Sequence, residues 1–427
     1  MNLRYPKYHS IKAGNINKCQ ICNYPKLNLI LDLGHQPLCD TLLSEQTLNE
    51  PEKSYPLRMM WCENCTGVQL DYCVDGKEVF HPSYPYLSGI SKPLVEYQRD
   101  IAHSLIKKYN LQHNDLVIDI GSGDGTLLKG FKEKNIRLLG IEPTNISDYA
   151  NSNGIKTIKS FFDIKLSNTV KRKHGKAKVI TTTNVFAHMQ TIGEFVTGIH
   201  NLLTEDGVFI SETHYLLDII KDSQFDTIYH EHLRTYSLKS IIKLFEPYDF
   251  TVTDVERGDR YGGNIRVHVS KGRGKKVSNS VKELLKLENS KGLNKIETYK
   301  KFAKKVQAEK INFINFLIKS KKSGEKVVGK SCPGRASTLL NYYGVDKELL
   351  PYLAELPTSL KLNMYLPGKH IPVVDEKILK KEQPDYIVLL AWHYADFIMP
   401  RLKKAGIKSD FVVPLPKFRI VRNKNIK

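Results

Sequence analysis

The sequence predicts an α/β protein of three units: a four-cysteine zinc-binding module, a central domain built on a parallel sheet, and a second, smaller α/β domain. Three observations predict this organisation. Two Cys-x-x-Cys pairs lie near the N-terminus, a buried strand runs into a glycine-rich turn at 115–125, and the same strand, turn and helix order returns after residue 325. A chain of 427 residues is longer than a single hydrophobic core usually supports, so more than one domain is expected. We expect units at 1–80, 81–275 and 276–427.

The composition is that of a folded protein without a membrane span. No apolar run reaches the roughly 18–20 residues that cross a bilayer, and MNLRYPKYHS has no signal-peptide pattern, so we expect a cytoplasmic protein. The formal net charge of +20 would attract polynucleotides. The lysines are spread over the whole length, which favours a solvated surface or a smaller phosphate-bearing substrate over nucleic acid.

The first unit contains the strongest metal signal. Two residues between thiols let both sulfurs reach one tetrahedral ion, and two such pairs form a closed structural zinc site. Four separate buried thiols are the alternative. The expected ligands are Cys19, Cys22, Cys62 and Cys65. The other cysteines lack a partner pair and are expected to be ordinary buried or loop residues: Cys39, Cys73 and Cys332.

The central unit shows alternating strand and helix patterns. A helical spacing of apolar residues over 91–109 introduces it, and the alternation that follows predicts a parallel sheet covered on both faces. The segment IRVHVSK reads as an edge strand near the end of the domain. The first expected strand is the apolar run that opens DLVIDIGSGDGTLLKGF, and the later ones are 137–143, 179–186, 207–213 and 265–271.

The glycine-rich turn carries the cofactor signal. Glycines allow the chain to turn sharply after a strand and allow a ligand to approach the backbone closely. An acidic residue about 20 positions later can accept hydrogen bonds from the ribose hydroxyl groups of a cofactor. With Thr183-Asn184 in a later strand, the pattern looks like a class I S-adenosylmethionine methyltransferase with a Rossmann-like fold; a dinucleotide domain is the alternative. The expected cofactor residues are Asp119, Gly121, Gly123, Gly125, Glu142 and Asn184.

The segment FDTIYHEH at 225–232 gathers a phenol, a carboxylate and two imidazoles. A histidine near its reference pKa of about 6.5 can remove a proton at neutral pH, with a neighbouring carboxylate orienting it. Structural hydrogen bonding and metal binding are the alternatives. We expect a catalytic role for this segment.

The last unit begins with one or two predicted connecting helices over 277–322, where Lys and Glu alternate with apolar residues at helical spacing. The sequence KVVGKSCPGRASTLLNYYGV then repeats the strand, turn and helix order, and 384–392 supplies another buried strand. A small α/β domain is the simplest interpretation.

Taken in order, these motifs resemble the nucleotide-sugar C-methyltransferase family, whose members methylate C3 of 4-keto-deoxysugars and carry an N-terminal zinc-binding domain. The resemblance covers nearly the whole chain. It rests on both cysteine pairs and on LDLGHQPLCD, DIGSGDGTLL, GIEP, NVFAHM, QFDTIYHEH, YGGNIRVHV, RASTLLNYYGV, PGKHIPVV and PDYIVLLAWHYAD.

The resemblance implies an activity and a set of site residues. His232 would be the base, assisted by Glu231 and Tyr229, and the substrate a nucleoside-diphosphate 4-keto-deoxysugar. No metal or redox cofactor is needed for that step. The implied substrate residues, for which packing or a surface role is the alternative, are Tyr84, Tyr86, His188, Arg335, Asn341, His370 and His393.

Two departures from the family pattern bear on the substrate. His393 stands where the family commonly has Asn, and Tyr261 stands where it commonly has His before paired glycines. A small-molecule O- or N-methyltransferase on the same scaffold is therefore the alternative enzyme. A nucleic-acid-binding protein and a non-catalytic scaffold are the other classes. The nucleotide, the sugar, the methylated carbon and the oligomeric state are left open.

Overall fold

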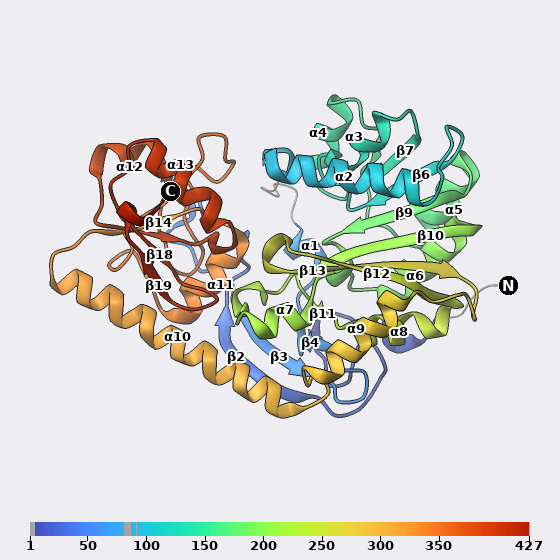
Figure 1. Cartoon of the computed structure of the whole chain (residues 1–427), viewed down its shortest axis with the longest axis horizontal. Helices are drawn as coiled ribbons and strands as arrows, with labels where there is room; N and C mark the ends of the chain where they lie inside the picture. Colours follow the sequence, from blue (N-terminus) through green and yellow to red (C-terminus); the bar gives the residue numbers. More distant parts are fainter. Residues whose placement is uncertain (1–4, 81–86, 91, 427) are drawn as a thin grey trace.

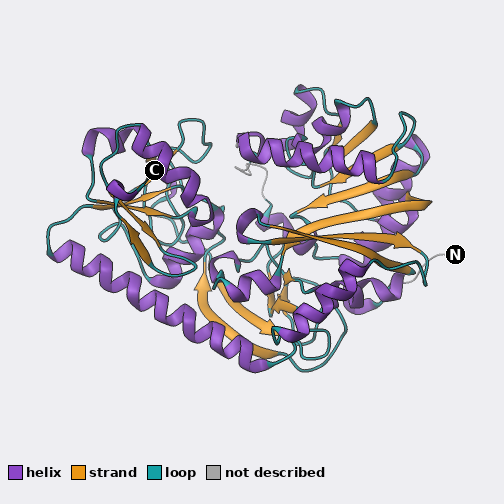
Figure 2. Cartoon of the chain, viewed as in Figure 1, coloured by secondary structure: helices purple, strands orange, loops and turns teal. Residues whose placement is uncertain are grey.

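The computed structural model describes residues 5–80, 87–90 and 92–426. Figure 1 shows the central domain and the C-terminal domain as two lobes. The strands of the zinc module and the long helix α10 (Ile296–Lys322) lie along one side and join the lobes. The fold has mixed α/β sheets, as predicted, and Figure 2 shows helices covering the sheets of both lobes.

The zinc module is built on an antiparallel sheet with an unexpected fourth strand. Its own strands are β2 (Asn28–Gln36), β3 (Tyr55–Trp61) and β4 (Val68–Leu70). The strand β11 (Arg234–Thr235), which follows the FDTIYHEH segment, pairs antiparallel with β4 and completes the order β11-β4-β3-β2. The zinc module therefore holds the end of that segment. Two short strands, β1 (Gly14–Asn15) and β5 (Tyr72–Cys73), and helix α1 (Gly76–Val79) complete it.

The central sheet has the order β12-β13-β10-β9-β6-β7-β8, with β6, β7, β8, β9 and β10 parallel. The first strand of this domain, β6, lies inside the sheet: β7 and β8 follow on one side of it, and β9 and β10 on the other. The strand order therefore reverses at β6. The strands are β6 (Leu116–Ile120), β7 (Arg137–Ile141), β8 (Thr157–Ile158), β9 (Ala177–Thr183), β10 (Leu203–His214), β12 (Phe250–Gly258) and β13 (Asn264–Lys271).

The prediction that 265–271 forms the edge strand is wrong. β13 lies between β10 and β12 and pairs antiparallel with both. β12 forms the edge, and its sequence FTVTDVERG alternates buried with more exposed residues. Its charged residues hide the strand pattern, because an edge strand needs only one apolar face.

Helices cover both faces of the central sheet. These helices are α2 (Lys92–Lys108), α3 (Thr126–Lys132), α4 (Ile146–Ser152), α5 (Ile164–His174), α6 (Ile192–Leu202), α7 (Leu216–Lys221) and α8 (Leu238–Phe245). Short 3₁₀ turns punctuate the loops, at Lys7–His9, Glu45–Thr47, Ser88–Ile90, Phe186–His188, Phe225–Thr227, Glu246–Tyr248, Arg260–Gly262, Trp392–Tyr394 and Asn423–Asn425.

Two connecting helices, α9 (Asn279–Ser290) and α10, confirm the prediction over 277–322. The buried carboxylate of Glu288 on α9 accepts the Tyr215 hydroxyl at 2.9 Å and the Leu238 N–H at 2.5 Å. That N–H is one of the unpaired donors at the start of α8, so Glu288 caps the helix from outside. The connecting helix thereby fixes the chain that follows β11.

The C-terminal domain repeats the doubly wound plan, with the strand order β16-β15-β14-β17-β18-β19. All strand pairs are parallel except β18 with β19. Its strands are β14 (Val327–Lys330), β15 (Leu353–Glu355), β16 (Val373–Asp375), β17 (Tyr386–Leu389), β18 (Asp410–Val413) and β19 (Arg419–Val421). Its helices are α11 (Gly334–Tyr343), α12 (Lys377–Glu382) and α13 (Ala395–Lys404).

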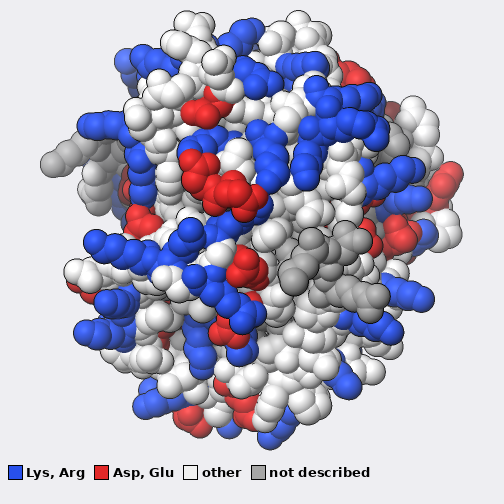
Figure 3. All heavy atoms as spheres, turned by 90° about the vertical axis from the view of Figure 1, so that its right-hand side faces the viewer, with Lys and Arg blue, Asp and Glu red and all other residues white. Residues whose placement is uncertain are grey.

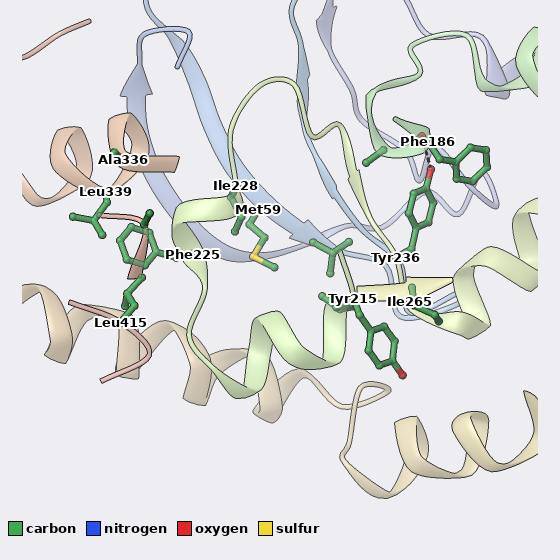
Figure 4. Packing of buried hydrophobic residues seen from close by; sticks show 14 of the residues in the cluster. Met59, Phe186, Tyr215, Phe225, Ile228, Tyr236, Ile265, Ala336, Leu339 and Leu415 are labelled. Carbon is green, nitrogen blue, oxygen red and sulfur yellow. Dashed lines mark hydrogen bonds between the residues drawn. The ribbon is translucent and has the colours of Figure 1, made fainter. Parts of the chain in front are cut away.

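One continuous apolar core runs through all three units. Figure 4 shows Phe225 beside Leu339 and Leu415 of the C-terminal domain, with Met59 of the zinc module packed close by. The Phe225 ring also stacks on Tyr343 at 5.2 Å. Because close-packed interiors resist deformation, this shared core holds the units in a fixed arrangement.

The surface charge is distributed. Figure 3 shows one face on which Lys and Arg side chains are scattered, with Asp and Glu side chains between them. No helix in the described ranges has both the length and the apolarity of a membrane span.

Candidate active site

A cavity of about 810 Å³ lies where the three units meet. The zinc module contributes Asp40 and Phe80, the central domain the glycine-rich turn and the FDTIYHEH segment, and the C-terminal domain the loops after β14, β15 and β17. In parallel sheets, ligands bind at the carboxyl ends of the strands where the strand order reverses. Both doubly wound sheets turn these ends toward the same cavity.

The glycine-rich turn after β6 leaves room for a ligand. Gly121, Gly123 and Gly125 have φ of +71°, +50° and +77°, the left-handed region that favours glycine. A Cβ on Gly121 would lie 2.4 Å from Val185 Cγ2, whereas a Cβ on Gly123 would meet open space. The turn therefore needs glycine both for its conformation and for close packing against the loop after β9.

Three polar side chains surround this turn. Glu142, at the end of β7, accepts the Gly123 N–H at 3.1 Å and the Thr144 hydroxyl at 2.7 Å. Asn184 has a positive φ of 56°, and its Oδ1 is buried without a partner among the described residues. Burial raises the pKa of Asp119 to about 7, although the Thr181 hydroxyl donates to it at 2.7 Å. These groups could hold the ribose and amino-acid parts of S-adenosylmethionine.

Gly121→Ala is expected to weaken S-adenosylmethionine binding by more than about 10-fold, because the new Cβ meets Val185 and the residue must keep a positive φ. Isothermal titration with S-adenosylmethionine measures the change. Gly154→Ala is the matched control, since Gly154 also has a positive φ of 73° but lies outside the cavity. Equal affinities of the two variants would contradict the prediction.

His232 lines the same cavity as the glycine-rich turn, and one of its ring nitrogens is fixed by a hydrogen bond. Its Nδ1–H donates to the Thr227 carbonyl at 2.7 Å, which leaves the Nε2 lone pair for another proton. The following residue is anchored to the zinc module, because the Leu70 N–H donates to the Leu233 carbonyl at 3.0 Å. The buried Arg234 then donates to Gln20 of the first cysteine pair and to the Met189 carbonyl.

Aromatic rings enclose His232. The Tyr229 ring lies 4.0 Å away between centroids, and the rings of His188 and His214 lie at 4.9 and 5.1 Å. Burial, with the Arg335 charge, lowers the pKa of His232 to about 4 even though the Thr227 carbonyl favours the protonated form. The imidazole is therefore neutral at physiological pH, and its pKa lies below the reference value of about 6.5 on which the sequence prediction relied.

Glu231 lies on the side of the cavity where the zinc module meets the C-terminal domain. The Cys39 thiol donates to Glu231 Oε1 at 3.4 Å, and the neighbouring Asp40 pairs with Lys361 at 2.5 Å. Lys361 also donates to the Cys332 carbonyl at 3.0 Å. Burial would lower the pKa of Lys361, but Asp40 outweighs it and raises that pKa. This buried ion pair joins the zinc module to the C-terminal domain at the cavity.

Arg335, at the start of α11, is held by the protein on all three nitrogens. Its Nε lies 3.2 Å from Asp226 Oδ2, and its terminal nitrogens contact the Gln224 side chain and the Tyr261 carbonyl. The Trp392 indole donates to the same Asp226 oxygen at 2.7 Å. A phosphate would therefore compete with these partners for Arg335, whose evident contribution is to join the C-terminal domain to the 225–232 segment.

The predicted substrate residues divide into three groups. His188, Arg335 and His393 line the cavity. Asn341 and His370 do not: Asn341 donates to the Pro367 carbonyl at 3.0 Å, and His370 pairs with Glu52 at 2.6 Å. These two side chains hold a turn of the C-terminal domain, and a role for them toward substrate stays a prediction. Tyr84 and Tyr86 lie outside the described residues.

The two departures from the family pattern lie together. The Tyr261 and His393 rings are 6.1 Å apart, and Tyr261 also lies 5.8 Å from His214. His393 Nδ1 lies 3.2 Å from an Arg335 nitrogen, so it accepts and its Nε2 carries the proton. The family resemblance identified both positions as departures, but the sequence does not indicate that they lie side by side in the cavity lining.

The structure adds cavity residues that the sequence did not indicate: Asp40, His214 and Lys361. His214 ends a strand that reads as ordinary sheet, and Lys361 lies in a loop without a motif. Lys361 had no local signal, whereas His214 could have been found as a polar residue at the carboxyl end of a buried strand.

The four predicted zinc ligands come together away from this cavity. Their sulfurs lie within 4.8 Å of one another, and the Cys19–Cys65 and Cys22–Cys62 distances are both 3.6 Å. Thiolates bound at about 2.3 Å to a tetrahedral ion lie about 3.8 Å apart, so the set fits zinc. Cys39, Cys73 and Cys332 are buried and free, as expected.

Family models match consecutive parts of the chain. Residues 19–80 match a zinc binding domain, 96–255 a methyltransferase domain, and 259–416 the C-methyltransferase C-terminal domain. A curated relative, the C-methyltransferase NovU of Streptomyces niveus, is 29% identical over 95% of this chain and 97% of its own length. Fold, site and comparisons define an S-adenosylmethionine-dependent methyltransferase with a zinc-binding domain. Together, the three family models and the curated relative support the C-methyltransferase family for this chain.

Solved methyltransferase structures are also similar to parts of the chain. An S-adenosylmethionine-dependent methyltransferase of Clostridium acetobutylicum is 17% identical, with a TM-score of 0.34, and the match covers 42% of this chain and 92% of that one. One from Anabaena variabilis is 15% identical, with a TM-score of 0.35 and coverage of 46% and 91%.

Proposed function

We propose that this C-methyltransferase transfers a methyl group to C3 of a nucleoside-diphosphate 4-keto-deoxysugar, with His232 as the base. The observation that carries the proposal is the orientation of His232. Its Nδ1–H is occupied by the Thr227 carbonyl, so Nε2 is the basic atom, and the side chain lines the same cavity as the glycine-rich turn.

Methylation of carbon explains why a base is needed. A C–H bond becomes acidic only when an adjacent carbonyl can take the electron pair, so the substrate must offer a ketone beside the methylated carbon. S-adenosylmethionine, when bound, supplies an electrophilic methyl group. The chain has to hold the ketone, remove its proton and keep water out of the site.

The residues of the central domain would divide this work between cofactor and sugar. Gly121, Gly123, Gly125, Glu142, Asp119 and Asn184 would hold S-adenosylmethionine. Tyr229 and His188 pack against His232 and would confine it and the sugar between them. Glu231, buried next to His232 in the chain, would stabilise the imidazolium that forms.

The C-terminal domain would receive the nucleotide. Its loops after β14 and β17 line the cavity, and Arg335 and Lys361 bring positive charge to it. Both cations already have carboxylate partners, so a diphosphate would share Arg335 with the buried Asp226 and Lys361 with Asp40 of the cavity lining. The family resemblance supports this substrate class, and the departures at Tyr261 and His393 lie where the sugar or nucleotide would be distinguished.

Mass spectrometry tests the proposal. The purified protein is incubated with S-adenosylmethionine and a panel of nucleoside-diphosphate 4-keto-6-deoxysugars that differ in nucleotide. The expected result is a gain of one methyl group on carbon. In deuterated buffer without S-adenosylmethionine, we expect deuterium to enter C3, because only a carbon acid exchanges there. Methylation at oxygen or nitrogen without exchange would instead establish the alternative enzyme.

A further inference from the structure

His214 is a cavity residue to which the mechanism above gives no task. It is the last residue of β10, and its backbone is paired with Asn264 of β13. It lies at the carboxyl end of a parallel strand, next to the end of β9 that carries Asn184. A side chain on such a position is held by the sheet and has little freedom to move.

The His214 ring lies against the base and facing the ligand space. Its centroid is 5.1 Å from that of His232, and it lines the cavity. Among the described residues, neither of its ring nitrogens has a hydrogen-bond partner, and neither is one of the fully enclosed polar atoms. A neutral imidazole always carries one N–H, so His214 offers the cavity a donor without an acceptor.

We infer that His214 is a catalytic residue, whose N–H donates a hydrogen bond to the carbonyl oxygen of the ketone while His232 removes the neighbouring proton. In this step the C–H bond breaks, its proton passes to His232 Nε2, and the electron pair moves through the new C–C double bond to the oxygen. His214 keeps its own proton throughout. The inference rests on the proposed function, because it requires a carbon acid beside a carbonyl.

The spacing of the two imidazoles fits this division of labour. In a ketone, the carbonyl oxygen and the acidic hydrogen are on neighbouring carbons, so the two groups that serve them have to lie a few ångströms apart and face one ligand. His188 fits less well, because its Nε2 is fully enclosed and its ring stacks on Phe80 at 5.5 Å. Both nitrogens of His214 lie outside the set of fully enclosed polar atoms, whereas His188 has one nitrogen inside it.

The electrostatic surroundings keep His214 in the neutral form that the task requires. Burial first, and then the charges of His232 and Arg335, hold the pKa of His214 well below 6.5. A charged His214 would repel both the sulfonium of the cofactor and the imidazolium at His232. Neutral imidazoles serve as hydrogen-bond donors to reacting carbonyls in other enzymes, and one donor to a developing oxyanion accounts for about 10²–10³-fold in rate.

The test is exchange of the sugar C3 hydrogen with deuterated buffer, followed by NMR without S-adenosylmethionine. His214→Phe keeps a ring of similar shape without a donor and should exchange about 10²–10³-fold more slowly than the wild type. His214→Gln restores an N–H and should recover at least about 10-fold of that loss. His113→Phe, at an exposed position, should exchange like the wild type. Thermal unfolding and S-adenosylhomocysteine binding show that each variant is folded.

Two failures can be told apart. Exchange in His214→Phe within about 3-fold of the wild type overturns the inference and leaves the proposed function intact. Failure of His214→Gln to recover activity, in a folded variant, also overturns the donor role. If the wild type exchanges no hydrogen of any offered 4-keto sugar, the proposed function fails, and the inference fails with it.

Discussion

His232→Asn is expected to lower methyl transfer by about 10²–10⁴-fold while S-adenosylmethionine binds as before. The loss is that of a general base, which typically contributes this much to the rate. Asn can still donate to the Thr227 carbonyl from its amide, so the loop should keep its conformation, but an amide cannot accept the proton. Because the pKa of His232 is lowered to about 4, wild-type activity should be independent of this group's protonation from about pH 5 upward.

Single-turnover methyl transfer and cofactor titration check this result together. His113→Asn is the matched control, because that histidine is exposed and its ring contacts a backbone carbonyl outside the cavity. Unchanged turnover in His232→Asn would remove His232 from the chemistry. Loss of cofactor affinity in step with turnover would instead assign it a structural role.

Cys62→Ser is expected to release zinc and to lower turnover by at least about 10²-fold, although the cysteines are not part of the cavity. Structural zinc sites contribute about 10–16 kcal/mol of apparent binding free energy to folding. Without zinc, the β3–β4 turn loses its anchor. The Leu70 contact to Leu233 and the Gln20 contact to Arg234 would then no longer hold the chain next to His232.

Zinc stoichiometry by mass spectrometry, the thermal unfolding midpoint and turnover are measured on the same preparation. Cys73→Ala is the control, because Cys73 is buried in the same module but is not part of the four-sulfur cluster. It should retain zinc and most of the activity. Full activity of a zinc-free Cys62→Ser protein would show that the module positions nothing in the active site.

The local chemistry of this chain could be predicted from the sequence, because it lies in short motifs. The cysteine pairs and the glycine-rich turn depend on neighbours a few residues apart, and the acidic residue after β7 follows the turn at a characteristic spacing. Periodicity located the long buried strands, but it missed the short strands of the central and C-terminal domains and the edge strand β12. Its alternating charged residues, such as Asp254 and Glu256, are stabilised by Lys108 on α2. That contact connects residues far apart in the chain, and periodicity carries no trace of it.

Long-range placement could not be predicted in the same way. Nothing local separates Arg335, which reaches the cavity, from Asn341, which lies two helical turns away and faces a turn of its own domain. Nor does the sequence around Lys361 show that Asp40 is its partner. Such contacts depend on how three units pack against one another, and the family resemblance transfers residue identities without that geometry.

The pairing of β11 with β4 has a consequence for synthesis. The zinc module is synthesised before Arg234 and Thr235, so its sheet is incomplete until these two residues have been added. At typical rates of translation the intervening chain takes on the order of ten seconds, during which β4 presents an unpaired edge. The cavity stays incomplete for longer, because the loops after β14, β15 and β17 that line it are synthesised later. The nascent chain therefore has an incomplete cavity until these loops of the C-terminal domain have been made.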